Sequence, residues 1–286
     1  MIKFGAHAFV WIGDWDTDGG NDTIRRAAEA GFDLLEIPLL NPDTFDAKSH
    51  KRVLDETGIE AAISLALPRE VHMPDHPEAA KRFLRRVFDH MDALGSRYIA
   101  GCIGYSLGAL TGAPPTREER ETIVEGLQEL AEDARGRGIT MALEACNRYE
   151  THLYNTLKDT REAVLAINGG SADGPVQLHA DTYHMNIEEE GFYTPFVEAA
   201  DVLGHVHMSE SHRGLVGTGT VNWDEAFRGL KDANFSGNLV LESFAAINPV
   251  IAAATALWRP TNAPPEVLAA EGLRFLRAGA EKHGLV

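Results

Sequence analysis

Four side chains of types that bind divalent cations stand at or near the ends of apolar stretches in the second half of the chain. The stretches are TMALE, VQLHAD, HVHM and NLVLE, and the four side chains are Glu144, Asp181, His207 and Glu242. Three carboxylates and one imidazole without a thiolate suit Mn²⁺, Mg²⁺ or Co²⁺ better than a closed structural zinc site. An ion that prefers about six ligands would keep two positions for water or for the oxygens of a hydroxy-ketone. The residue types therefore predict one divalent metal site that is open to a small substrate.

The alternation of side chains along these stretches predicts that the candidate ligands share one face of a sheet, because successive side chains of a strand point to opposite faces. One parity holds large apolar residues, namely Met141, Leu143, Leu178, Val206, Met208, Leu239 and Leu241. The other parity holds Ala142, Glu144, His179, Asp181, His205, His207, Val240 and Glu242. In each stretch, the last residue of the second parity is a candidate ligand. It lies toward the carboxyl end of the strand, where barrels of alternating strands and helices carry their active sites.

The elements that must position these ligands form a strict alternation of strands and helices. Strand-like apolar runs occupy Lys3–Ala8, Asp33–Leu39, Ala61–Leu67, Arg97–Ile103, Thr140–Cys146, Val176–Asp181, His205–Met208 and Leu239–Phe244. Helical stretches lie near 22–30, 46–57, 78–94, 117–136, 159–167, 194–202, 223–233 and 266–283. Eight such pairs predict an α/β fold, a (β/α)8 TIM barrel that forms a single domain over residues 1–286. A doubly wound open sheet is the alternative.

Several predicted boundaries carry signals of their own. Gly31 and Gly138 follow helical stretches, at positions where a residue in the left-handed conformation ends a helix. Asn21-Asp22 and Pro115-Thr116 precede helical stretches as capping positions. No linker, charge block or repeat divides the sequence, and barrels of this kind run to about 250 residues as one unit.

The composition excludes several classes of function. The 286 residues include 26 Lys and Arg against 43 Asp and Glu, and the net charge of −17 opposes binding to nucleic acid. Two cysteines, Cys102 and Cys146, are too few for a disulfide framework and fit a reducing compartment. The opening segment does not read as a secretory signal, and the longest apolar run, Ile251 to Trp258, is far too short to span a bilayer. We therefore expect a cytoplasmic protein that binds neither nucleic acid nor membrane.

Four segments around the candidate ligands resemble the ketose 3-epimerases, the group of the D-tagatose, D-allulose (psicose) and L-ribulose 3-epimerases. These segments are LEACNRYE, DTYHMNIEE, HVHMSESHRG and LVLESF. The resemblance continues through GAHAFVW, GFDLLEIPLLNP, GTGTVNWDEAF and ALWR, so it covers nearly the whole chain. It implies an isomerase of the xylose isomerase-like TIM barrel superfamily that epimerises free ketoses at C3 with the help of a metal ion.

The resemblance also implies roles for seven side chains. The metal ligands would be Glu144, Asp181, His207 and Glu242, and the substrate contacts would be Glu150, His184 and Arg213. Glu144 and Glu242 would in addition form the catalytic acid/base pair. The cofactor would be one divalent ion, Mn²⁺ in the first place and otherwise Co²⁺ or Mg²⁺. The partner would be a small-molecule ketose of the D-allulose/D-fructose, D-tagatose/D-sorbose or L-ribulose/L-xylulose type, and the family implies a homo-dimer or homo-tetramer.

The chemistry of a ketose explains why two carboxylates are needed. The hydrogen on C3 is acidic because it lies α to the C2 carbonyl, and a metal that binds O2 and O3 stabilises the cis-enediolate left when that proton departs. Epimerisation then needs a proton on the opposite face, which two flanking carboxylates deliver most simply. An aldose–ketose isomerase of the hydroxypyruvate-isomerase type would form the same enediolate, so it stays as the alternative reaction.

Two other functions on the same scaffold fit the sequence poorly. A DNA-repair enzyme of the endonuclease IV type needs a cluster of zinc ions with histidines at the ends of the third and fourth strands. Those ends read SLALP and GCIGY and hold no histidine. A non-catalytic sugar-binding barrel would not need two glutamates placed for proton transfer.

Some neighbours of the candidate ligands allow two interpretations. Glu210 either orients Arg213 or is an exposed loop carboxylate. His179 and His205 lie one layer below the ligands, where core histidines are favoured over residues that support the metal site. Cys146 is expected to be a buried, inert thiol.

Aromatic residues and two departures from the family bear on the sugar. His7, Trp11 and Trp258 either form the wall around the sugar or belong to the core. Ser209 stands where relatives more usually carry glycine, and the segment 259–265 departs from a tryptophan-bearing pattern. Both departures leave open which sugar is the substrate, but they do not change the expected reaction.

Overall fold

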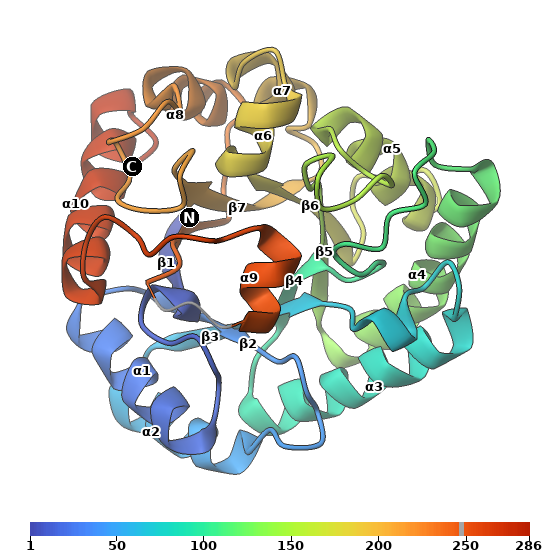
Figure 1. Cartoon of the computed structure of the whole chain (residues 1–286), viewed down its shortest axis with the longest axis horizontal. Coiled ribbons are helices and arrows are strands. Elements are labelled where there is room, and N and C mark those ends of the chain that lie inside the picture. The colour runs from blue at the N-terminus through green and yellow to red at the C-terminus, as the bar shows by residue number, and fades with distance from the viewer. Residues whose placement is uncertain (246–248) are drawn as a thin grey trace.

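Eight parallel strands form a closed barrel at the centre of the molecule. The computed structural model describes residues 1–245 and 249–286. The strands are β1 (Lys3–His7), β2 (Leu34–Pro38), β3 (Glu60–Ala66), β4 (Tyr98–Cys102), β5 (Thr140–Glu144), β6 (Val176–Asp181), β7 (Leu203–Ser209) and β8 (Asn238–Glu242). They pair in chain order, and β8 pairs with β1 to close the ring, as the view down the barrel in Figure 1 shows. The predicted (β/α)8 TIM barrel is confirmed.

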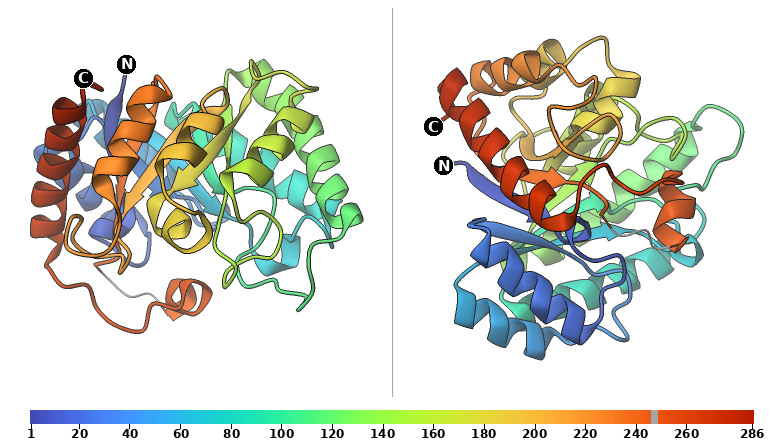
Figure 2. Two further views of the ribbon diagram at one scale, coloured as in Figure 1. Left: turned by 90° about the horizontal axis from the view of Figure 1, so that it is seen from above. Right: turned by 60° about the vertical axis from the view of Figure 1, so that its left-hand side comes forward.

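Helices surround the strands as an outer layer, apart from one short helix near the carboxyl end of the chain that lies over an end of the barrel (Figures 1 and 2). The α-helices are α1 (Thr17–Glu29), α2 (Ala47–Thr57), α3 (Pro77–Leu94), α4 (Arg117–Arg137), α5 (Leu157–Ile167), α6 (Thr182–Glu188), α7 (Tyr193–Glu198), α8 (Trp223–Asp232), α9 (Pro249–Thr255) and α10 (Pro265–His283). All eight predicted helical stretches are present. The prediction of strict alternation is wrong in one respect, because α6 and α9 are additional helices. Within the described ranges, no helix is both long and apolar enough to cross a membrane.

The start of α1 differs from the prediction. The helix begins at Thr17 with Asp16 as its N-cap, so Asn21-Asp22 is not the capping position. Two consecutive glycines, which are poor helix formers, concealed the first turn in the sequence. Gly20 is needed there, because a Cβ atom would lie 2.6 Å from the Trp15 ring and 2.9 Å from the His50 ring.

The other predicted boundaries hold. Thr116 caps α4 in a capping box with Glu119, and Gly138 ends the same helix with a φ of 66°. Gly31, just after α1, has a φ of 87°. These residues satisfy main-chain groups that a helix end leaves without partners.

The two side-chain parities of the last strands separate as predicted. The large apolar residues of the first parity belong to the main core, which the barrel shares with the helices. Val240, of the second parity, belongs to a small cluster with Leu34 and Ala62. The strands β6 and β7 shift in register after Leu178, and this shift brings Asp181 opposite His207. The barrel interior therefore carries polar side chains from adjacent strands at one level.

Candidate metal and catalytic site

The seven side chains predicted for the site lie together at the carboxyl-terminal mouth of the barrel. Three of them end β5, β6 and β8, one lies on β7, one on α6 and two in loops; they are Glu144, Glu150, Asp181, His184, His207, Arg213 and Glu242. None is more than 7% exposed. All except Asp181 line one cavity of about 70 Å³. A larger groove of about 670 Å³ lies on the outside of the molecule along α5 and α7 and contains none of them.

The four predicted metal ligands fall into two overlapping groups. Ligand atoms of Asp181, His207 and Glu242 all lie within 4.8 Å of one another. The same limit holds for Glu144, Asp181 and His184. Asp181 is common to both groups, because it ends the strand between those of Glu144 and His207. The predicted ligands therefore lie around the fully buried carboxylate of Asp181 at the mouth of the barrel.

A glutamate that the sequence analysis did not single out supports His207. Glu36, on β2, accepts a hydrogen bond from His207 Nε2 with an N–O distance of 2.6 Å. The pKa of Glu36 is held well below its usual range, since His207 and His205 outweigh the effect of burial. Its signal was a lone charged residue at the inward parity of the apolar run Asp33–Leu39.

His184 is held in one tautomer by Asn147. The main-chain N–H of Asn147 donates to His184 Nδ1 at 3.1 Å, so the ring proton lies on Nε2. That nitrogen is 3.6 Å from Glu144 Oε1 and 3.5 Å from Asp181 Oδ2. The Asn147 side chain also donates to Glu150 Oε1 at 2.8 Å. Asn147 lies in the LEACNRYE segment, yet its residue type alone gave no reason to single it out.

Arg213 balances the acidic groups of the mouth. Its guanidinium pairs with Glu242, lies 3.4 Å from Asp181 Oδ2 and 3.6 Å from Glu150 Oε1. The centre of the Tyr183 ring lies 3.9 Å from the guanidinium carbon. The positive charge is therefore buried among carboxylates and against an aromatic face, where it interacts strongly with both.

The backbone of Arg213 is itself unusual, with a φ of 57°. This left-handed conformation costs free energy for a residue with a side chain. Neighbouring groups hold it: the Arg213 N–H donates to Glu210 O at 2.8 Å, and Ser243 Oγ donates to Arg213 O at 2.7 Å. The loop thus turns the side chain of Arg213 into the cavity.

The acidic groups differ in protonation. Burial raises the pKa of Glu144 to about 8. Burial and the nearby Glu242 raise the pKa of Asp181 well above its usual range. Glu242 behaves in the opposite way, because Arg213 and His207 outweigh burial and hold its pKa well below its usual range. Glutamates whose surroundings push their pKa values apart can serve as acid and base at the same pH.

The donor set fits a divalent cation. His207 Nδ1 is buried, lies 3.3 Å from Glu242 Oε1, and makes no hydrogen bond within the described part of the chain. It faces the carboxylates of Asp181 and Glu242, and the group contains no sulfur. An imidazole nitrogen among carboxylate oxygens matches the ligands that Mn²⁺ and Co²⁺ accept. A cation would also reduce the repulsion among these carboxylates.

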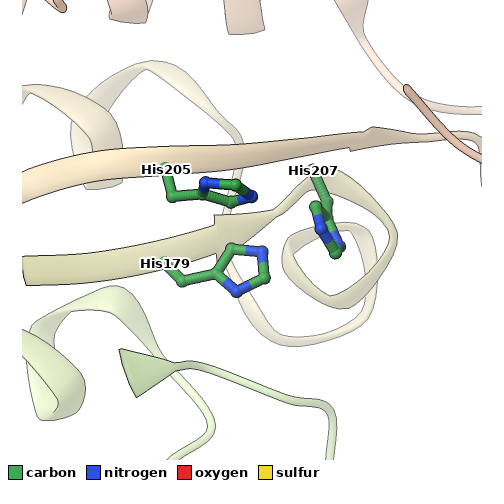
Figure 3. Close-up of side chains that lie close together, drawn as sticks. All are labelled: His179, His205 and His207. Carbon is green, nitrogen blue, oxygen red and sulfur yellow. The ribbon is translucent and has the colours of Figure 1, made fainter. Parts of the chain in front are cut away.

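Two more histidines lie one layer below His207, at the predicted positions. Figure 3 shows the three rings side by side, His179 from β6 and His205 and His207 from β7. The ring centre of His179 is 4.1 Å from that of His207 and 4.6 Å from that of His205, and both pairs meet edge to face. Burial lowers the pKa of both His179 and His205, so both rings are neutral. They fill the barrel beneath the ligand groups.

The structure excludes one of the two interpretations of Glu210, and under the other it shows that Glu210 acts on Arg213 through the loop. Its side chain is fully buried, so it is not an exposed loop carboxylate. Its carboxylate accepts hydrogen bonds from Trp223 Nε1 at 2.9 Å, and from the main-chain N–H groups of Gly217 at 2.9 Å and Val221 at 3.2 Å. Glu210 therefore folds the loop that carries Arg213 and makes no side-chain contact with Arg213 among those found in the described residues.

The aromatic residues near the mouth divide between cavity, core and surface. His7 lines the cavity, and its Nε2 is 2.9 Å from Ser64 Oγ. Trp11 is buried in the main core, and Trp258 is 73% exposed; neither lines the cavity. Ser209 is fully buried at the level of Glu242, and its hydroxyl has no hydrogen-bond partner within residues 1–245 and 249–286.

Comparison with known proteins identifies the family. The model of a family described as "Xylose isomerase-like TIM barrel" matches residues 24–279. The L-ribulose 3-epimerase of Methylomonas sp. (strain DH-1) is 38% identical over 282 residues, which cover 96% of this chain and 97% of that protein. The ketose 3-epimerase of Arthrobacter globiformis is 34% identical over 282 residues, with 96% of each chain covered.

A solved structure agrees with these relatives. The crystal structure of a D-allulose 3-epimerase from Methylomonas sp. in complex with D-allulose superposes with a TM-score of 0.91 at 36% identity, covering 97% of this chain and 96% of that chain. The resemblance noted from the sequence motifs is therefore confirmed. The chain belongs to the ketose 3-epimerases of the xylose isomerase-like TIM barrel family, and it is a carbohydrate epimerase.

Proposed function

We propose that this chain interconverts free ketoses that differ in configuration at C3, with Glu144 and Glu242 as the acid/base pair. The candidate substrates are the pairs D-allulose/D-fructose, D-tagatose/D-sorbose and L-ribulose/L-xylulose. The names of the similar proteins, which act on L-ribulose or bind D-allulose, support this class of sugar. A cavity lined by carboxylates, imidazoles and a guanidinium also suits a substrate rich in hydroxyl groups.

The observation that carries the proposal is the location of the two glutamates. Glu144 ends β5 and Glu242 ends β8, three positions apart in the closed ring of eight strands. Both line the same cavity. Carboxylates that approach one carbon from different sides can remove a proton from one face and return a proton to the other, as inversion at C3 requires.

The proposed reaction moves one proton off C3 and another onto it. An ionised glutamate takes the C3 proton, and the electron pair of the broken C–H bond moves into the enediolate of the sugar. The second glutamate, which starts protonated, gives its proton to the opposite face and forms the new C–H bond. In the reverse direction the two glutamates exchange roles.

Three other side chains are proposed to hold the sugar. His184, with its proton on Nε2, can donate to a sugar oxygen, and Arg213 offers further donors from its planar guanidinium. Glu150 can accept from a hydroxyl through Oε2, which is buried and has no hydrogen-bond partner in the described part of the chain. Such contacts fix C3 between the two glutamates and so lower the entropy cost of the reaction.

One divalent ion is part of the proposal, with Mn²⁺ preferred and Co²⁺ or Mg²⁺ as alternatives. Its ligands would be Glu144, Asp181, His207 and Glu242. When bound, the ion supplies positive charge that stabilises the negative charge on the oxygens of the enediolate. The buried Nδ1 of His207, which makes no hydrogen bond within the described residues, supports this assignment.

Chelation and reconstitution test the proposal. Metal-stripped protein, and protein loaded with Mn²⁺ or Co²⁺, are incubated with each free ketose, and the products are separated by chromatography. We expect C3 epimers from the loaded protein and at least about a hundredfold loss after chelation. Full activity after chelation would contradict the metal dependence. Aldoses as the sole products would replace the epimerase with the aldose–ketose isomerase.

The proposal also covers assembly and location. We propose a cytoplasmic homo-dimer or homo-tetramer. The side chains of Tyr149, in the loop after β5, and Trp258, between α9 and α10, are 71% and 73% exposed and offer apolar surface for a second copy. Light scattering coupled to gel filtration tests the assembly, and a single-chain mass in solution would contradict it.

A further inference from the structure

The two cysteines of the chain meet beside Glu144 in the mouth of the barrel. Cys102 is the last residue of β4, and Cys146 follows the end of β5. Their Sγ atoms are 3.5 Å apart, and Cys102 Sγ is 3.7 Å from Glu144 Oε2. All three side chains line the cavity, and one ligand atom from each lies within 4.8 Å of the others. The proposed reaction uses Glu144 but neither thiol.

The separation of the sulfurs matches a pair of metal ligands. A disulfide bond would need about 2.05 Å, and both cysteines are free. Around a tetrahedral Zn²⁺, bonds of about 2.3 Å to sulfur and about 2.0 Å to oxygen put two sulfurs about 3.8 Å apart, and a sulfur and an oxygen about 3.5 Å apart. The observed separations differ from these values by no more than about 0.3 Å.

Main-chain contacts hold the two strand ends in this arrangement. The hydroxyl of Tyr105 donates to the carbonyl of Glu144 at 2.8 Å. The N–H of Cys146 donates to Tyr154 O at 3.1 Å, and Asn155 Nδ2 donates to Cys146 O at 2.8 Å. Ligands fixed in this way lose little conformational freedom when an ion binds.

We propose that Cys102, Cys146 and Glu144 bind a thiophilic divalent cation such as Zn²⁺ or Cd²⁺, at a position distinct from the ion of the reaction. Thiolates select such ions, whereas Mn²⁺ and Mg²⁺ prefer oxygen ligands. Each thiol, and the carboxyl group of Glu144, gives its proton to solvent as it binds, so three protons leave the metal-stripped site as one divalent ion enters. The ion offsets the negative charge of the two thiolates and the carboxylate, which avoids the cost of an uncompensated buried charge.

Occupation of the thiol site inhibits the enzyme, and this consequence rests on the proposed function. Glu144 bound through Oε2 to the thiophilic ion can no longer carry the C3 proton. The ion also takes space in the cavity of about 70 Å³ that the sugar needs. Binding itself does not depend on the reaction, so binding and inhibition are measured separately.

Cadmium titration followed by ultraviolet absorbance tests the binding. Thiolate bound to Cd²⁺ gives a charge-transfer band that oxygen and nitrogen ligands do not give, so the band reports the thiol site alone. The metal-stripped protein should develop a band that saturates at one thiolate-bound ion per chain. Cys102→Ser and Cys146→Ser should each weaken Cd²⁺ binding by at least about tenfold, and the double variant should lose the band. Circular dichroism verifies that each variant is folded.

Ser64→Ala is the matched control, because Ser64 is another polar residue of the same cavity but carries no sulfur. It should leave the band unchanged. Absence of the band in the wild-type protein, or its persistence in the double variant, would overturn the site whether or not the chain proves to be an epimerase.

Inhibition is read from the Mn²⁺-loaded protein in the presence of Zn²⁺, with every variant compared with its own zinc-free activity. The Zn²⁺ concentration for half inhibition should rise at least about tenfold in Cys102→Ser. Equal inhibition of the wild type and this variant would overturn the inhibitory role.

Discussion

Glu36 accepts a hydrogen bond of 2.6 Å from His207 Nε2, across the interior of the barrel from β2 to β7. Although burial lowers the pKa of His207, Glu36 and Glu242 raise it well above its usual range. Nδ1 faces the group of Asp181 and Glu242, and it would bind an ion after losing its own proton. A carboxylate behind a metal-binding histidine fixes the ring and raises its basicity. Glu36 therefore prepares His207 as a ligand.

Glu36→Gln tests this relationship. The amide keeps the size of the side chain but removes its negative charge and replaces one carboxylate oxygen with a donor. The hydrogen bond to His207 Nε2 therefore weakens. We expect the affinity for Mn²⁺ to fall about 10- to 100-fold, measured by calorimetric titration. The matched control is Glu60→Gln on the exposed start of β3, which should bind Mn²⁺ as the wild type does. Unchanged affinity in Glu36→Gln would show that Glu36 does not support the site.

The acid/base pair predicts that Glu144→Gln and Glu242→Gln each abolish turnover. An amide neither accepts nor delivers the C3 proton, so kcat should fall by at least about 10²- to 10⁴-fold in each variant. Initial rates on D-fructose and D-allulose measure the loss, and circular dichroism verifies the fold. Turnover within about tenfold of the wild type in either variant would refute the two-carboxylate scheme.

Arg213→Lys should impair catalysis although it keeps the positive charge. A lysine ammonium cannot reproduce the planar contacts of the guanidinium with Glu242 and Glu150, or its contact with the Tyr183 ring. Loss of a charge-assisted hydrogen bond of about 1.5–3 kcal/mol corresponds to a fall of about 10- to 100-fold in kcat/KM. Arg228→Lys, on the exposed face of α8, is the control. Equal kcat/KM values for Arg213→Lys and the wild type would contradict the role of Arg213.

His72 predicts a dependence of stability on pH. The main-chain N–H of Ser106 donates to His72 Nδ1 at 3.0 Å, and burial lowers the pKa of His72 from 6.5 to about 4. Because the unfolded chain takes up this proton first, the free energy of unfolding falls as the pH drops from about 6.5 to about 4, and it is unaffected by this group above that range.

His72→Asn keeps an acceptor but does not titrate. Between pH 7 and pH 5 the wild type should lose about 1 kcal/mol more of its free energy of unfolding than the variant does, after allowance for solvent screening. Urea unfolding at both pH values measures the difference. His76→Asn, at an exposed position nearby, should follow the wild type. Parallel losses in the wild type and His72→Asn would contradict the assignment.

The barrel could be predicted because its strands are largely apolar and its helices amphipathic. The short helices could not. In α6, which follows β6 without a loop, Asp181 caps the helix by accepting from the N–H of Tyr183 at 2.7 Å. One residue thus ends a strand, begins a helix and enters the metal group, and seven helical residues are too few for a periodic pattern.

The ligands could be predicted because each one stands at or near the end of its own strand. The residues that hold the site histidines in place could not be predicted, because their hydrogen bonds join segments that are distant in the sequence. Glu36 and His207 are separated by 171 positions in the chain, and Asn147 and His184 by 37. The contact between Cys102 and Cys146 could not be predicted either, because it depends on the pairing of β4 with β5, which brings the two sulfurs together.

Isotope exchange in D₂O tests the central claim most directly. Mn²⁺-loaded protein is incubated with D-fructose in D₂O, and the recovered sugars are examined by nuclear magnetic resonance. We expect D-allulose with deuterium at C3 and, as the reaction approaches equilibrium, deuterium at C3 of the recovered D-fructose, whereas Glu144→Gln and Glu242→Gln should form no D-allulose. Deuterium at C1 with protium retained at C3 would contradict C3 epimerisation.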